Sequence, residues 1–206
     1  MELFGRRATV ILRALRKSTL KRLDEQDTGA LEKAFTVIAE GGVVAHATEG
    51  VWGLSCDPEV PGAVTRVLEI KARDQKKGFI LIGGSADAFA PELSALSEAQ
   101  CAAIAQTWPG AHTWILPNVR FSAAITGGRE TIACRVPGHE QARALAAMFG
   151  RPIVSTSANR SGEAAATTES QVQALFGSEV DYVVSGQVLR PGVPSAIHTL
   201  DGARLR

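Results

Sequence analysis

The chain has 206 residues, of which 45% are hydrophobic and 21% are charged, and its formal net charge at pH 7 is +1. A chain of this length buries enough surface to fold as one domain without disulfides, and its balanced charge does not demand a nucleic-acid or membrane partner. No apolar run approaches the roughly 20 residues of a membrane span. Three widely spaced cysteines fit a reducing, cytoplasmic environment and form no metal-binding cassette.

The first 23 residues are strongly basic. They hold seven Lys and Arg side chains against Glu2 alone, a local net charge of +6 that leaves −5 for the other 183 residues. Interspersed leucines allow a basic amphipathic helix, while a disordered extension or an unused upstream start is the plainer alternative. Arg-rich, acid-poor segments also occur as transit peptides and RNA-binding arms. We interpret residues 1–26 as an extension and residues 27–206 as the folded domain.

Periodicity and stop signals predict the elements that follow in chain order. The helices are expected from Leu31 to the glycine stop at Gly41, then over 63–71, 97–108, 139–149 and 169–176. The strands are expected over 43–45, 79–82, 113–116, 131–136 and 153–155, and near 182–184 and 196–200. Ser97 with Gln100 three residues later indicates a capping box.

Strands and helices are mixed throughout, without strict alternation. This pattern favours the mixed α/β class, with a twisted parallel and antiparallel sheet and helices on both faces, over a barrel or a plain nucleotide-binding fold. No repeat or long linker divides the chain after residue 30, so one domain is the economical interpretation.

The common catalytic signatures are missing. The sequence has no phosphate-binding G-x-x-x-x-G-K-[ST], no G-x-G-x-x-G after a strand, no H-E-x-x-H and no G-x-S-x-G. The four histidines are scattered singly, which disfavours chemistry through a histidine-bound metal or a histidine triad.

Three segments carry chemistry. The first runs from Lys71 to Gly78, with four cations at a predicted helix end that leads directly into a strand. One interpretation is a helix terminus followed by a solvated turn, since cations are favoured near a helix C-terminus. The other is a phosphate clamp, because arginine offers a planar fork to phosphate oxygens and lysine a compact charge. Taken alone, the run favours the surface interpretation.

The second segment is S-T-S-A-N-R-S-G, from Ser155 to Gly162, directly after a predicted strand. Such a hydroxyl-rich loop commonly presents oxygens and amides to a ligand, and the alternative is a turn that satisfies only its own backbone. The third segment runs from His46 to Leu54. Its Thr48 and Glu49 are expected where a strand end opens into a pocket, and Trp52 is expected in the core.

Together these segments resemble the YrdC-like domain of the threonylcarbamoyl-AMP synthase family, in its short single-domain bacterial form. The resemblance covers about residues 30–206 and rests on six motifs in order, each weak alone. The motifs are T-E-x-V-W-G-L-x-C-D-P (48–58), K-A-R with K-G-F-I-L-I (71–82), W-P-G with a following threonine (108–113), C-R-V-P (134–137), S-T-S-A-N-x-S-G (155–162) and P-S-A-I (194–197).

The resemblance implies that residues 27–206 form a YrdC-like catalytic domain whose concave, positive face binds ATP and L-threonine. In the implied nucleotidyltransferase reaction, threonine and bicarbonate or CO2 give a carbamate, which attacks the α-phosphate of ATP and expels pyrophosphate. A separate complex would then transfer the threonylcarbamoyl group to tRNA, and the basic face is a candidate for RNA contact. Magnesium is expected with ATP, although the sequence shows no dedicated carboxylate cage for it.

The resemblance also assigns residues by matching position. It implies no covalent intermediate, so these residues hold two anionic reactants together and exclude water. The implied ATP-binding residues are Lys71, Arg73, Lys77, Thr113, Ser155, Ser157 and Asn159, with Lys71 and Arg73 stabilising charge. The implied threonine-binding residues are Thr48, Arg135 and Ser195.

The chain departs from the family pattern at a few positions. The family usually has an aromatic residue and proline where this chain has His46 and Ala47, proline and an aliphatic residue at Ala111 and His112, and threonine at Ala196. The first departure is expected to alter the shape of the threonine pocket. Two other functions stay open: an RNA-binding or ribosome-assembly factor, and a carbamoyl-transfer domain of related fold. The 5% aromatic content gives few platforms for base stacking.

Overall fold

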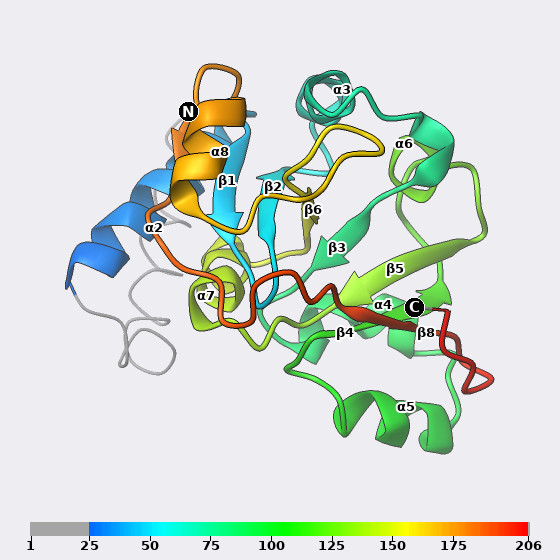
Figure 1. The fold of residues 1–206 in the computed structure, drawn as a ribbon. Helices are drawn as coiled ribbons and strands as arrows, with labels where there is room; N and C mark the ends of the chain where they lie inside the picture. The colour runs from blue at the N-terminus through cyan, green and yellow to red at the C-terminus, as the bar shows by residue number, and fades with distance from the viewer. Residues whose placement is uncertain (1–24, 206) are drawn as a thin grey trace, which may run out of the picture.

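A computed structural model describes residues 25–205, so the basic segment before residue 25 lies outside the described residues. The described chain forms one eight-stranded sheet with helices around it (Figure 1). The strands are β1 (Val44–Ala47), β2 (Trp52–Cys56), β3 (Ile80–Ile82), β4 (His112–Pro117), β5 (Thr131–Arg135), β6 (Ile153–Ser157), β7 (Tyr182–Val183) and β8 (Ala196–His198). The α-helices are α2 (Glu25–Ala39), α3 (Pro61–Ile70), α4 (Ala90–Leu93), α5 (Glu98–Ala105), α6 (Ala123–Thr126), α7 (Glu140–Phe149) and α8 (Glu169–Phe176), with 3₁₀ turns η2 (Gln75–Lys77) and η3 (Ala86–Phe89).

The sheet is mixed, as the sequence predicts. Its strand order is β7-β1-β2-β6-β3-β5-β4-β8. Strands β1 and β2 form an antiparallel hairpin, and β6 runs antiparallel to both β2 and β3. The pairs β3–β5, β4–β8 and β1–β7 are parallel. The chain therefore returns from residue 153 into the middle of a sheet that earlier segments begin.

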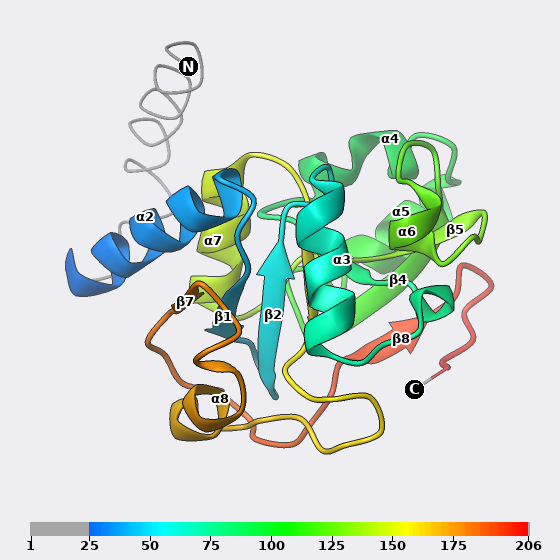
Figure 2. The same ribbon diagram turned by 90° about the horizontal axis from the view of Figure 1, so that it is seen from above.

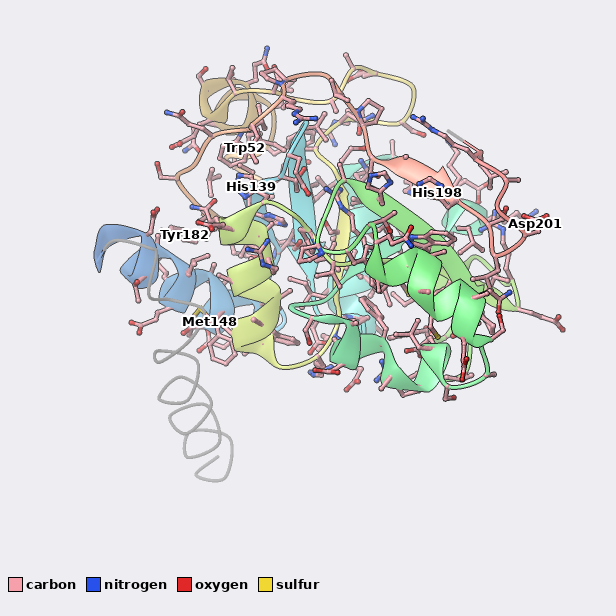
Figure 3. All side chains as sticks on the ribbon, turned by 90° about the horizontal axis from the view of Figure 1, so that it is seen from below. Trp52, His139, Met148, Tyr182, His198 and Asp201 are labelled. Carbon is pink, nitrogen blue, oxygen red and sulfur yellow. The ribbon has the colours of Figure 1, made fainter. Side chains whose placement is uncertain are left out.

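Helices cover both faces of the sheet, which confirms the predicted layers. Helices α2 and α7 lie side by side (Figures 1 and 2), and they bury Leu31, Ile38 and Met148 against Val44 and Ile153 of the sheet. Met148 lies on α7 (Figure 3). Because side chains alternate along a strand, the neighbouring strand residues point to the opposite face. There they join the larger core beneath α3, α6 and α8.

Local signals predicted several helix ends correctly. The capping box at Ser97 and Gln100 is present at the start of α5, and α8 has the bounds that the sequence predicts, with its own capping box at Thr168 and Gln171. Helix α7 ends at Gly150 in a left-handed conformation with φ of 74°, which glycine adopts without steric cost.

Other expectations were wrong in their bounds. Helix α2 begins at residue 25, six residues earlier than predicted, and it runs through Gly29. Packing of its apolar stripe on α7 therefore outweighs the low helix propensity of glycine, about 1 kcal/mol. Strand β2 was not predicted. Its five residues are all buried, and a strand buried on both sides lacks the alternation that identifies half-exposed strands.

The two outermost strands, β7 and β8, are joined by residues 184–195 (Figure 1). We call residues 190–195 the strap. Its backbone is fixed to the turn between β1 and β2, because Arg190 N donates to Glu49 O (2.6 Å) and Gly192 N donates to Gly50 O (2.8 Å). A Cβ atom on Gly50 would lie 1.7 Å from the carbonyl oxygen of Val193. Glycine at position 50 is therefore required for this close approach.

Candidate active site

A cleft of about 300 Å³ opens over the central strands, on the same face of the sheet as α2 and α7, because its lining residue Ile82 pairs with Ile153 of the α2–α7 core. Strand register explains its lining. Gly53 pairs with Ser157, Ser155 pairs with Ile80, and Ile82 pairs with Arg135, so these side chains share one face. The strap closes one side of the cleft with Val193, Pro194 and Ser195. Segments that lie far apart in the sequence therefore meet over four adjacent strands.

The serine-rich segment is partly strand and partly turn. Ser155, Thr156 and Ser157 belong to β6 and line the cleft, so the strand continues two residues beyond its predicted end at residue 155. Asn159 then turns the chain. Its Oδ1 accepts from Ser157 Oγ (2.6 Å), and its Nδ2 donates to the carbonyls of Arg160 and Glu163 (both 2.9 Å). We call residues 157–159 the polar turn.

Lys71 lies beneath the polar turn, not in the cleft lining. Only 1% of its surface is exposed. Its Nζ donates to Ser157 O, to Asn159 O (2.8 Å) and to Asn159 Oδ1 (3.1 Å). All three donors of the ammonium therefore hold this turn. Burial, with smaller contributions from Arg73 and Lys77, lowers the pKa of Lys71 to about 7.

Arg73 reaches the cleft from the cationic turn that follows α3. Its Nη2 donates to Gly78 O (2.8 Å), and its guanidinium stacks on Phe79. Its Nε is buried without a partner among the described residues. Burial, and then the charge of Arg129, lower the pKa of Arg73. A cation with an unused buried donor at a cleft wall is suited to an anionic ligand.

Lys77 lies outside the cleft lining. Its side chain is exposed, and its Nζ donates to Ser161 Oγ (3.0 Å) beyond the polar turn. Lys71, Arg73 and Lys77 nevertheless form one cationic group. Arg73 and Lys77 both lie close enough to lower the pKa of Lys71, and Lys71 and Lys77 both contact residues 157–161.

Arg135 and Glu49 form an ion pair at the opposite end of the cleft. Both side chains are 10% exposed, and Arg135 Nη2 contacts Glu49 Oε2. Arg135 Nε donates to Gly110 O (3.0 Å), and Gly138 N donates to Glu49 Oε1 (2.6 Å). The sequence pointed to Arg135 but assigned no role to Glu49, whose signal was its place directly after Thr48 at a strand end.

The remaining predicted residues lie around this ion pair. Thr48 lines the cleft, and its Oγ1 donates to Val51 O (2.7 Å) within the β1–β2 turn. Ser195 lines the cleft from the strap, and its Oγ lies 3.1 Å from Oγ1 of Thr113, which is fully buried behind it. Seven of the ten predicted site residues thus line one cleft, and Lys71, Lys77 and Thr113 support it from behind or beside.

The departures from the family pattern lie mostly away from the cleft lining. His46 is fully buried. Its Nδ1 donates to Ala47 O (3.0 Å), so Nε2 accepts from Ser55 Oγ (2.8 Å). Desolvation by burial lowers the pKa of His46 to about 4. His112 hydrogen-bonds (2.9 Å) to His198 of β8, which is labelled in Figure 3.

A larger groove of about 890 Å³ lies between α2, α8 and residues 182–191. It shares only Trp52 with the cleft, and its lining has no Lys or Arg among the described residues. The smaller cleft is therefore better suited to a phosphate ligand. Over residues 25–205 no group of three or more His, Cys, Asp or Glu side chains could hold a metal ion. No helix in this part of the chain is long and apolar enough to cross a membrane.

Comparisons with known proteins agree with this geometry. The family model Sua5_yciO_yrdC, described as "Telomere recombination", matches residues 36–206. A curated relative from Vibrio vulnificus (strain YJ016), named threonylcarbamoyl-AMP synthase, is 40% identical over 170 residues, which are 81% of this chain and 91% of the relative.

Two solved structures show the same architecture. The crystal structure of P. abyssi Sua5 complexed with L-threonine has a TM-score of 0.80 and 32% identity; the match covers 85% of this chain but only 53% of that one, about half its length. E. coli YciO, at 23% identity and a TM-score of 0.69, covers 82% of each chain and supports the fold alone. The family match, the relatives and the cleft agree, and the chain belongs to the Sua5_yciO_yrdC family.

Proposed function

We propose that this chain is a threonylcarbamoyl-AMP synthase, which makes threonylcarbamoyl-adenylate and pyrophosphate from ATP, L-threonine and bicarbonate. The curated relatives have this name, and their matches to this chain cover most of their length. The P. abyssi neighbour was crystallised with L-threonine. They favour the synthase over the RNA-binding and carbamoyl-transfer alternatives. The observation that carries the proposal is the placement of a cationic turn and an Arg–Glu pair at opposite ends of one cleft.

The cationic end is suited to the triphosphate. Arg73 faces the cleft with an unused buried donor, and Ser155 and Ser157 present hydroxyls from the adjacent strand. Nucleotidyl transfer is catalysed mainly by positioning and by offsetting charge on the phosphates. We propose that Arg73, with Lys77 nearby, stabilises charge on the phosphates, and that Lys71 acts by holding Ser157 and Asn159 in place.

Magnesium is expected to enter with the nucleotide. The carboxylates in the cleft lining are Glu49, which is paired with Arg135, and Glu163, on the exposed side of the polar turn. A magnesium ion that keeps several waters and binds mainly to substrate phosphates needs few protein carboxylates. We therefore propose that the ion is held chiefly by ATP, where it offsets charge on the phosphates.

The Arg135 end is suited to threonine. A guanidinium with free N–H groups binds a carboxylate with directional, charge-assisted hydrogen bonds. Thr48 and Ser195 line the same end. Bound there, threonine would lie in the same cleft as the phosphates. The reaction then forms a carbamate C–N bond, after which a carbamate oxygen attacks the α-phosphate and pyrophosphate leaves.

The wider roles follow from the product. An acyl-adenylate hydrolyses readily, so we propose that a separate transfer enzyme consumes it on tRNA. The exposed Lys76 and Lys77 beside the cleft are candidates for RNA contact, which is electrostatic and therefore sensitive to salt.

The test is pyrophosphate release from ATP, with mass detection of threonylcarbamoyl-AMP. The full chain should release pyrophosphate only when L-threonine and bicarbonate are both present. Carbamoyl phosphate in place of threonine and bicarbonate is the control for the carbamoyl-transfer alternative. Release that does not depend on threonine would refute the proposal.

A further inference from the structure

The ion pair of Glu49 and Arg135 is placed differently from the other buried acid–arginine pairs. Asp57 and Arg151 form a two-point pair, with contacts of 2.8 and 2.5 Å, and Asp57 is 3% exposed. That pair lines none of the cavities described above, whereas Glu49 and Arg135 both line the cleft. A pair that only stabilised the fold would not need to face a ligand cavity.

Both members of the pair retain capacity for a ligand. Glu49 accepts one bond at Oε1 from Gly138 N and one contact at Oε2 from Arg135. A carboxylate has about four lone-pair sites, so about two remain. On Arg135, Nε is used by Gly110 O and Nη2 by Glu49, and Nη1 has no partner among the described residues.

The direction of the Glu49 side chain is fixed from both sides. Its backbone carbonyl accepts from Arg190 N of the strap, and the preceding residue closes the β1–β2 turn through Thr48 N to Val51 O (3.1 Å). The Gly138 amide holds the far end of the side chain. A Cβ on Gly138 would lie 3.2 Å from Glu49 Oε1, so the carboxylate is in close contact with this backbone. Glu49 is therefore preorganised before any ligand binds.

An α-amino acid carries its ammonium and its carboxylate on the same carbon. A guanidinium and a carboxylate that lie in contact in a cleft wall form the complementary surface. The substrate carboxylate can bind at Arg135 Nη1 while its ammonium donates to Glu49. Such hydrogen bonds between charged groups are the strong ones in proteins.

We propose that Glu49 is a substrate-binding residue that accepts a hydrogen bond from the amine of threonine. This inference rests on the proposed function. Arg135 and Glu49 together then select α-amino acids over hydroxy acids and over carboxylic acids without an amine. They also position the threonine nitrogen that attacks the carbon of bicarbonate. Glu49 is also the acceptor for the proton that the ammonium loses. The balanced change is R-NH₃⁺ plus HCO₃⁻ plus Glu-COO⁻ to R-NH-COO⁻ plus H₂O plus Glu-COOH.

The test separates amine recognition from simple support of Arg135. Calorimetry without bicarbonate measures binding of L-threonine and of its hydroxy-acid analogue, in which a hydroxyl replaces the amine. Wild type, Glu49→Gln and Asp57→Asn are compared, the last as a matched change in a buried acid–arginine pair outside the cleft. We expect Glu49→Gln to weaken threonine at least about 10-fold, the equivalent of one charged hydrogen bond, and the hydroxy acid by less than about 3-fold.

Several outcomes would overturn the inference. If Glu49→Gln weakens both ligands equally, Glu49 only positions Arg135. If wild type binds both ligands equally, the amine is not recognised. If wild type binds neither ligand and releases no pyrophosphate, the proposed function fails, and the inference fails with it. Should Glu49→Gln not fold, Glu49→Asp keeps the charge but withdraws it by one methylene, and the same selective loss for threonine is expected.

Discussion

Replacement of Lys71 by methionine tests how the polar turn is held. Methionine has nearly the same length but no charge. In the wild type the buried ammonium has a pKa of about 7, whereas a lysine in the unfolded chain has a pKa near 10.4. Between these values the unfolded state binds more protons than the folded state, so the stability of the wild type rises with pH.

The size of the effect follows from the two pKa values. Each unit of difference corresponds to about 1.4 kcal/mol, so a rise from pH 7 to pH 10 should add up to about 4 kcal/mol to the free energy of unfolding. In Lys71→Met this gain is absent, because the titrating group is gone. The variant also leaves three oxygens of Ser157 and Asn159 without their donor, so the affinity for ATP should fall even where the protein remains folded.

The assay is urea unfolding at pH 7, 8, 9 and 10 for both proteins. The control is Lys76→Met, which removes an exposed lysine from the same turn and should keep the wild-type profile. Taking the difference between wild type and Lys71→Met cancels the contributions of all other titrating groups. Parallel stability curves for the two proteins would refute the burial of a charged Lys71 beneath the polar turn.

Two further changes test the β1–β2 hairpin. His46 has a folded pKa of about 4 against 6.5 in its ordinary state, so the unfolded state binds the proton first and stability should fall by about 3 kcal/mol from pH 6.5 to 4. His46→Phe should reduce this loss in acid urea titrations, and an unchanged acid dependence would show that other groups cause it. Gly50→Ala places a Cβ 1.7 Å from Val193 O, so we expect the strap to shift, with about 1–3 kcal/mol of destabilisation and faster proteolysis near Leu189. Unchanged proteolysis and unchanged threonine affinity would contradict the assigned contact.

The sequence predicted the parts of the fold that depend on local signals. Helix α8 and the capping box of α5 match because their caps and apolar spacing lie within a few residues of each other. Strand β2 was missed because it is buried throughout and gives no alternating pattern. Strand β6 was predicted to end at residue 155, because hydroxyl-bearing residues follow, although it continues to Ser157.

The site was predicted less completely, because its contacts join distant parts of the chain. Motif order identified Arg135, Ser155 and Ser157 as candidates, and strand register brings them to one face. The sequence could not show that Lys71 contacts residues 86 and 88 positions later. Nor could it show that Arg135 is already paired with Glu49, since nothing in the spacing of the two residues indicates contact.

The two outer strands of the sheet have a consequence for synthesis of the protein. Strands β7 and β8 both come from residues 182–198, so both edges are completed by a segment that is synthesised after all the other strands. Until then β1 and β4 expose unpaired backbone groups, a state that favours aggregation. The strap belongs to the same segment, so the cleft is walled on that side only when the edges are covered. A nascent or truncated chain that ends before residue 182 would therefore lack both the protected edges of the sheet and a closed site.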